Sequence, residues 1–346
     1  MKRFLSVLLV MVMVLGLAAC GSAETASSSA STKGTPAAST SAGGSDKTAT
    51  SADVSGLKLG VSINALDSVT NRMMYQAAQS YAESLGIDVV ATNAGDTTKQ
   101  ADDVDNLVQA GCNAIILMNA DSSVCSNAVK EASDAGVSII SLESGWMTGV
   151  SCLFALNNYK IGAEMCNDLL AAIGYSGKVI ITGHNDHPVV RAHLNVYKSM
   201  IAEYPDVQIV NEIHTTYPGT TEVTYKGVAS ALIQNPDVVA IFCSQDLEAL
   251  GAVQALKEQD LYPQVKVVAH DGMLEVLEEI KNNDCIISTI YPDSTECAKD
   301  AVDIAVKLAN GETVNPYYER TYATVNDSNV DEYIALAKEN ETKYAK

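Results

Sequence analysis

Short apolar runs alternate with longer amphipathic segments along residues 58–121. The alternation predicts strands at 59–63, 89–91 and 114–118, and helices at 72–85 and 101–110 that are each closed by a glycine. Strands that are apolar throughout and separated by helices indicate a parallel sheet with helices on both faces. Ligands bind such sheets at the carboxyl ends of the strands, where the loops here are rich in Asn, Asp, Ser and Thr and poor in cations. The loops therefore predict a hydrogen-bonding rim for a neutral polyhydroxyl or amide ligand.

The same alternation continues to residue 290 and forms two successive series. The first adds strands at 137–142 and 153–156 and helices at 122–135 and 159–173. The second has strands at 178–182, 208–213, 238–243, 266–269 and 286–290, with helices at 190–203, 222–234, 247–259 and 275–282. Two series of similar size predict two doubly wound, Rossmann-like α/β lobes with a ligand cleft between them. We expect the chain to cross back at a helix over 294–308 and to end in a short strand and a helix over 330–339.

The first 20 residues have the pattern of a bacterial export signal. Lys2 and Arg3 precede an apolar run at 4–17 that is too short to span a membrane comfortably. The following Leu-Ala-Ala-Cys resembles a lipobox, which implies cleavage before Cys20 and attachment of diacylglycerol to its thiol. An ordinary signal peptide with a chance cysteine is the alternative. Residues 21–53 are nearly all Ser, Ala, Thr and Gly, which predicts a flexible tether.

Net charge and cysteine usage limit the classes of partner and function that the chain can have. Without Lys2 and Arg3, 20 basic and 42 acidic residues remain, a net charge of −22 that opposes a polyanionic partner such as nucleic acid. Seven cysteines besides Cys20 remain, an odd number without metal-binding spacing. We therefore expect mostly free, buried thiols, and a single disulfide is the alternative.

No P-loop, GxSxG, HExxH or EF-hand motif is present, and no nucleophile–base pair is readable, so we expect neither an enzyme nor a cofactor. His184, Asp186, His187 and His193 suggest zinc only weakly, because their spacing falls in a loop, and no metal is assigned.

Several stretches resemble the type I periplasmic binding proteins of the ribose/galactose class. They are, in order, GVSINALDSV, NAGDTTKQADDVDNLVQAGCNAIIL, VSIISLES, ALNNYKIGAEM, NPDVVAIFCSQDLEALGAVQALKEQ, VKVVAHDGML and CIISTIYPD. The resemblance runs from about residue 57 to the C-terminus. It implies two lobes joined by a three-crossover hinge, closing on a sugar that is delivered to the permease of an ABC importer. The resulting division is a signal peptide at 1–19, a lipidated cysteine and tether at 20–55, an N-terminal lobe at 56–157 plus 292–318, and a C-terminal lobe at 158–291 plus 319–346.

The resemblance also implies a set of ligand-binding residues. They are Asn64, Asp67, Glu143, Trp146, Asn158, Arg191, His193, Tyr217, Gln245, Asp271 and Tyr291. The family's aromatic residues are missing from the first loop, so Trp146 could supply a ring face instead. The family's Asp-Arg after the fourth strand is Glu143-Ser144 here, and the second arginine of its Arg-x-Arg is His193. Carboxylates and amides pair with two sugar hydroxyls at once, and Glu143 and Asp271 lie in opposite lobes, so both are satisfied only in the closed cleft.

These observations predict a monomeric, lipid-anchored, extracytoplasmic receptor that captures a small polar solute, a monosaccharide, for an ABC permease. The alternative is a receptor for a non-sugar ligand, such as an autoinducer furanone or a nucleoside, that serves uptake or a sensory kinase. The missing first-loop aromatics and the histidine at 193 motivate that alternative. A transcription regulator is disfavoured because an export signal and tether stand where a DNA-binding headpiece would be.

Overall fold

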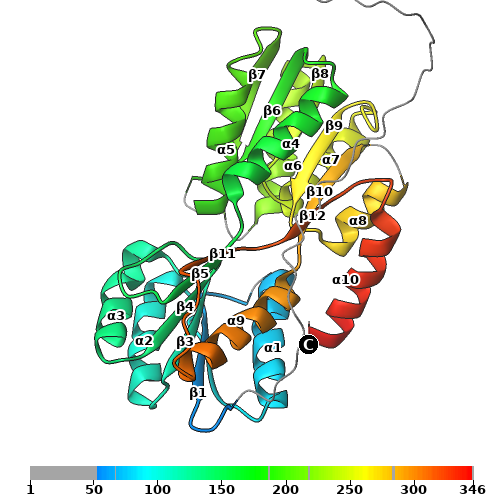
Figure 1. The fold of residues 1–346 in the computed structure, drawn as a ribbon. Helices are drawn as coiled ribbons and strands as arrows, with labels where there is room; N and C mark the ends of the chain where they lie inside the picture. The colour runs from blue at the N-terminus through cyan, green and yellow to red at the C-terminus, as the bar shows by residue number, and fades with distance from the viewer. Residues whose placement is uncertain (1–52, 67, 186–187, 217–218, 283–284, 345–346) are drawn as a thin grey trace, which may run out of the picture. The chain divides into compact units, whose positions relative to one another are not determined.

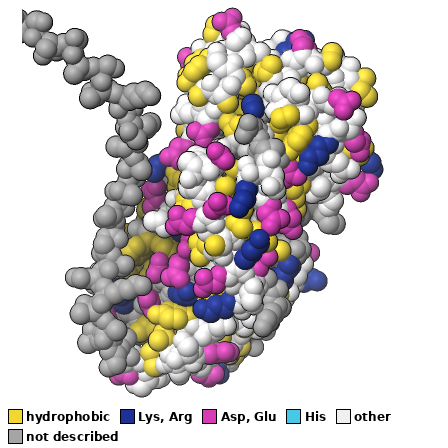
Figure 2. Space-filling model, turned by 90° about the vertical axis from the view of Figure 1, so that its right-hand side faces the viewer, with side chains coloured by type: hydrophobic (Ala, Val, Ile, Leu, Met, Phe, Trp, Pro, Cys, Tyr) yellow, Lys and Arg dark blue, Asp and Glu magenta, His cyan; other side chains and the backbone are white. Residues whose placement is uncertain are grey.

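The computed structural model describes residues 53–344, except 67, 186–187, 217–218 and 283–284. This part of the chain forms two α/β lobes, each built on a six-stranded sheet (Figure 1). Among the described residues, no helix combines the length and apolar character needed to cross a bilayer. On the face shown in Figure 2, acidic and basic side chains are interspersed.

The first lobe is a wholly parallel sheet with helices on both faces. Its strands lie in the order β11 (Tyr317–Glu319), β5 (Cys152–Ala155), β4 (Ser138–Leu142), β3 (Ala114–Met118), β1 (Lys58–Ile63) and β2 (Asp88–Asn93). Its helices are α1 (Val69–Ser84), the short 3-10 helix η1 (Thr97–Lys99), α2 (Gln100–Gln109), α3 (Ser122–Asp134) and α9 (Ser294–Ala309). Alternate residues of β3 point to opposite faces: Ile116 packs with α1 and α9, whereas Ile115 packs with α2 and α3.

The second lobe repeats this arrangement with one antiparallel edge strand. Its strands lie in the order β12 (Tyr322–Val325), β10 (Ile286–Pro292), β9 (Lys266–His270), β8 (Val238–Cys243), β6 (Gly177–Gly183) and β7 (Val207–His214), and β12 alone runs antiparallel to its neighbour. Its helices are α4 (Asn158–Ala172), α5 (Pro188–Ile201), α6 (Thr220–Gln234), α7 (Asp246–Glu258), α8 (Leu274–Asn282) and α10 (Val330–Tyr344). The cores on its two faces are both closed by these helices.

The chain passes between the lobes three times. It crosses from β5 into α4, returns from β10 into α9, and crosses again from β11 into β12. The prediction of two doubly wound lobes joined by a three-crossover hinge is therefore confirmed.

Local signals explain where the elements begin and end. The Ser68 hydroxyl accepts a hydrogen bond from the Asn71 amide at 3.0 Å and so caps α1. Gly86 follows that helix with φ +80°, a conformation that glycine adopts without steric cost. The expected strands and helices are present with ends shifted by a few residues, except that the final helix runs on to Tyr344 and strand β11 was not predicted. The seven cysteines beyond Cys20 are buried thiols.

Candidate functional site

The carboxyl ends of β8 and β9 bring polar side chains to one edge of the second-lobe sheet. Asp271 follows β9, and its amide donates to the Ile290 carbonyl at 3.0 Å, which fixes the loop against β10. Its carboxylate lies 3.1 Å from Nδ1 of His270 and is only partly buried. Gln245 follows β8, and its buried Oε1 has no hydrogen-bond partner among the described residues. The edge therefore offers a carboxylate and an amide oxygen as acceptors.

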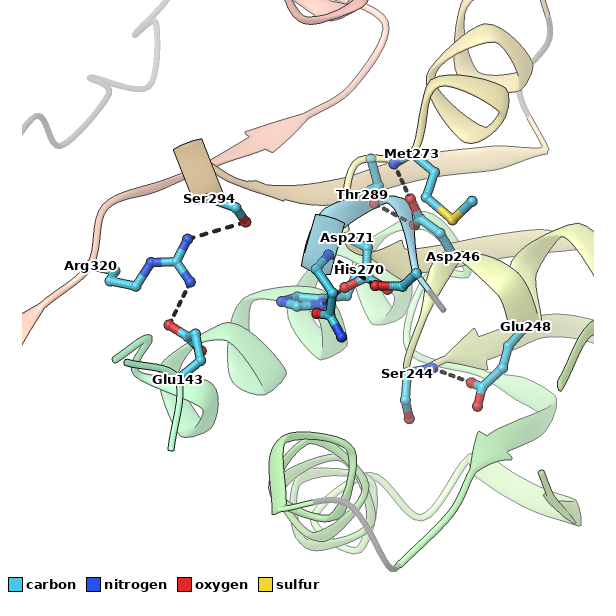
Figure 3. A network of polar contacts seen from close by, with 12 residues as sticks. Glu143, Ser244, Asp246, Glu248, His270, Asp271, Met273, Thr289, Ser294 and Arg320 are labelled. Carbon is cyan, nitrogen blue, oxygen red and sulfur yellow. Dashed lines mark hydrogen bonds and ion pairs between the residues drawn. The ribbon is translucent and has the colours of Figure 1, made fainter. Parts of the chain in front are cut away.

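Two buried carboxylates accept hydrogen bonds from the loops that follow these strands (Figure 3). Asp246 accepts from the Met273 amide at 2.6 Å and from the Thr289 hydroxyl at 2.8 Å, so it joins the ends of β8, β9 and β10. Glu248 accepts from the Ser244 amide at 2.8 Å. Both side chains are fully buried. They position the loops, and no local pattern in the sequence indicates this role.

Glu248 also connects two strands that the sequence separates widely. Its carboxylate accepts from the hydroxyl of Thr182 at 2.8 Å and from that of Thr215 at 2.9 Å. These threonines lie at the carboxyl ends of β6 and β7. Glu248 thus joins the ends of β6, β7 and β8, which makes the second-lobe edge a rigid platform.

Burial raises the pKa of both acids. The pKa of Glu248 rises from 4.5 to about 7, because the protein interior disfavours its charged form. The pKa of Asp246 rises from 3.8 to about 7 through burial and, secondly, through the nearby charge of Asp271. Ionising either group therefore costs more in the folded chain than in the unfolded chain.

We expect the free energy of unfolding to fall as the pH rises from about 4.5 to about 7. The folded state holds these protons more tightly than the unfolded chain, so their stabilising effect is lost as the pH passes the folded-state pKa, by on the order of 3 kcal/mol per group. Glu248→Gln should flatten this decline, since an amide does not ionise and can donate to the Thr215 hydroxyl. Urea unfolding at pH 5 and pH 7.5 measures it, and an unchanged decline in the variant would contradict the assignment.

Two histidines and an arginine complete the second-lobe side. The fully buried ring of His193, from α5, lies 5.0 Å from the ring of His270. Arg191 is exposed and donates to the Asn185 carbonyl. Its charge helps to lower the pKa of Asp121, which hydrogen bonds from Ser123 lower most. Within the described residues, no group of three or more His, Cys, Asp or Glu could hold a metal ion.

The first lobe contributes Glu143, which is tied to the hinge. Glu143 has φ +55°, and its Oε1 accepts from the Arg320 guanidinium at 2.5 Å and from the Leu156 amide at 3.2 Å. Arg320 is 4% exposed and also donates to the Ser294 hydroxyl at 3.4 Å, as Figure 3 shows. The Arg320 amide donates to the Ala155 carbonyl at 3.0 Å. Arg320 therefore lies where all three crossovers meet.

The remaining residues predicted to bind ligand differ in burial and in hydrogen bonding. Asn64 is half-buried and its Oδ1 accepts from the Ala65 amide at 2.8 Å. Asn158, at the first crossover, has a buried Oδ1 with no hydrogen-bond partner in the described part of the chain. Trp146 is 54% exposed. Tyr291 is buried, and its hydroxyl accepts from Asn340 at 3.4 Å.

The structure thus groups two sets of the predicted residues. His193, Gln245 and Asp271 lie at the second-lobe edge, and Glu143 and Asn158 lie at the hinge. Asp67, Tyr217 and the lipidation site Cys20, like Asp186 and His187 of the zinc alternative, lie outside the described residues.

Known proteins resemble this chain over most of its length. The ribose import binding protein of Bacillus subtilis (strain 168) is 26% identical over 261 residues, which are 74% of this chain and 83% of that protein. The D-apiose import binding protein of Paraburkholderia graminis is 29% identical over 245 residues, 69% of this chain and 77% of that protein.

Solved structures share the fold. An ABC transporter solute binding protein from Actinobacillus succinogenes, with bound D-allose, superposes with a TM-score of 0.72 at 24% identity, over 80% of this chain and 100% of that one. An ABC transporter solute binding protein from Bacillus halodurans, with bound myo-inositol, superposes with a TM-score of 0.74 at 24% identity, over 82% of this chain and 99% of that one. The model of the periplasmic binding protein domain matches residues 59–313. The chain belongs to the periplasmic binding protein family.

Proposed function

We propose that this chain is the substrate-binding lipoprotein of an ABC importer and that it captures a monosaccharide between its two lobes. The observation that carries the proposal is the family match over residues 59–313, together with relatives that are import binding proteins for ribose and D-apiose and a D-xylose-binding periplasmic protein. The protein binds and releases its ligand without chemical turnover, as a receptor does. It acts outside the cytoplasm, as a monomer, and hands the ligand to a membrane permease.

The chemistry of the strand ends supports an uncharged, hydroxyl-rich ligand. Asp271 and Gln245 offer acceptor oxygens, and Arg320, the one buried Lys or Arg among the described residues, is already paired with Glu143. A sugar hydroxyl donates to such acceptors and accepts from neighbouring donors at the same time. An anionic ligand would be repelled by the Asp271 carboxylate.

Ligand contact with both lobes supplies the reason for closure. Asp271 belongs to the second lobe, whereas Glu143 follows β4 of the first. A ligand that bonds both carboxylates gains its full set of hydrogen bonds only when the lobes approach, so it favours the closed state by that difference in affinity.

Isothermal titration calorimetry of the purified protein tests the proposal. The ligands are D-ribose, D-apiose, D-xylose, D-allose, myo-inositol and, as a non-sugar comparison, adenosine. We expect one of the sugars or the polyol to bind at one site with a Kd of about 1 μM or below. Tight binding of adenosine with none of the others bound would overturn the sugar assignment.

The lipid anchor gives a second test. Cys20→Ala removes the thiol that would carry the diacylglycerol, so the protein should move from the membrane fraction to the soluble extracytoplasmic fraction. Cys112→Ala is the matched control, since that cysteine is buried in the first lobe. Fractionation followed by immunoblotting measures the change, and a Cys20 variant that stays with the membrane would refute the anchor.

A further inference from the structure

The C-terminal helix α10 packs into both lobes. In its first half, Val330, Ile334 and Ala337 belong to the second-lobe core that also contains α8. At its other end, Tyr344 is 5% exposed and belongs to the first-lobe core formed by α1, α9 and the sheet. Figure 1 shows the helix running from α8 towards α1. One rigid element is therefore anchored on each side of the hinge.

A third anchor lies between these two along the helix, beside the second crossover. Asn340 is 8% exposed, and its Nδ2 donates to the Tyr291 hydroxyl of β10 at 3.4 Å. Its Oδ1 accepts from the Thr295 hydroxyl of α9 at 3.5 Å. Tyr291 and Thr295 flank the crossover, so Asn340 holds the point at which the chain leaves one lobe for the other.

The first-lobe anchor involves charge as well as apolar packing. The ammonium of Lys299, on α9, lies 5.9 Å from the centre of the Tyr344 ring, and that of Lys343 lies 4.9 Å from it. A cation near an aromatic face is attracted by the ring quadrupole. Tyr344 is therefore held from α9 in addition to its contacts in the core.

The helix also borders the candidate ligand site. A narrow crevice is lined by Thr70 and Met73 of α1, by Ala337 of α10 and by Asp271 of the second-lobe edge. Any movement of α10 against α1 therefore changes the surroundings of Asp271.

We infer that α10 is a strut that limits the rotation of the two lobes about the hinge. Its 15 residues form a rod of about 22 Å that cannot stretch. Rotation of one lobe as a rigid body changes the distance between the two anchors, so it must withdraw Tyr344 or bend the helix. The Tyr344 anchor consequently sets how far the lobes move, in addition to the ligand contacts in the cleft.

Spin-label distance measurements without added ligand test the strut. Labels are placed at the exposed positions Asp105→Cys in the first lobe and Glu203→Cys in the second, with Cys20→Ser to avoid a third label. The other cysteines are buried and should not react. Tyr344→Ala should widen the inter-lobe distance distribution by roughly twofold, because the end of α10 is then released from the first-lobe core.

Two control variants separate the strut from a general loosening of the fold. Tyr344→Phe keeps the ring in the first-lobe core and should retain the narrow distribution. Glu339→Ala, at an exposed position on the same helix, should do so too. A Tyr344→Ala distribution as narrow as that of the parent protein would overturn the inference. So would equal widening in either control. The result does not depend on ligand identity, so it stands or falls separately from the proposed function.

Discussion

Asp271→Asn is expected to weaken ligand binding by about 100-fold, or roughly 3 kcal/mol. The carboxylate stands at the end of β9, is partly exposed and lies beside His270, so it can accept hydrogen bonds from two ligand hydroxyls. An amide of the same shape keeps one acceptor oxygen but turns the other into a donor. Calorimetric titration with the sugar that binds best measures the loss.

A control is available at a second aspartate with an unusual backbone. Asp260 also has a positive φ, of 56°, and is exposed at the end of α7. Asp271 has a positive φ too, of 130°. Asp260→Asn therefore removes the same charge at another aspartate of positive φ, and it should leave the affinity unchanged. Equal affinity in the Asp271 variant and the parent protein would remove Asp271 from the ligand site.

Arg320→Met should lower the free energy of unfolding by about 3–5 kcal/mol. The exposed fractions of the Arg320 and Glu143 side chains are 3% and 11%, so losing the guanidinium leaves the Glu143 carboxylate buried without its counter-charge. The Ser294 hydroxyl also loses a donor. Urea unfolding at pH 7 measures the change.

The double variant isolates the ion pair from the loss of packing. Adding Glu143→Gln removes the stranded charge, so it should restore about 2 kcal/mol of the lost stability. As an exposed comparison, Lys281→Met breaks the pair between Lys281 and Asp331, whose side chains are 51% and 76% exposed, and should cost less than about 1 kcal/mol. An Arg320 variant that is no less stable than the Lys281 variant would contradict the proposed centre of the hinge.

The fold could be predicted because its signals are local. Apolar runs such as 114–118 coincide with a strand, Ala114–Met118, that is buried along its whole length. Strand β11 escaped prediction because Tyr317–Glu319 is short and mostly exposed, and only its pairing with β5 makes it a strand. The strand is thus defined by a contact about 160 residues away in the sequence, which no local pattern reveals.

Some residues of the candidate site could likewise be predicted from the sequence, and others could not. Gln245 and Asp271 could be proposed because the stretches that contain them resemble the ribose/galactose-class binding proteins, and both residues closely follow apolar strands at the ligand-binding edge of a parallel sheet. Glu248 and Arg320 could not, because their partners are distant: Thr182 lies 66 residues from Glu248, and Glu143 lies 177 residues from Arg320. Buried charges are explained by the groups that surround them in space, and those groups are known only once the fold is built.

A crystal structure of the protein grown with its best-binding sugar would show whether the ligand lies between the lobes. We expect one sugar molecule there, with hydroxyls within hydrogen-bond distance of the Asp271 carboxylate on one side and of the Glu143 carboxylate on the other. A sugar bound on the outer surface of a single lobe, with neither carboxylate in contact, would contradict this expectation.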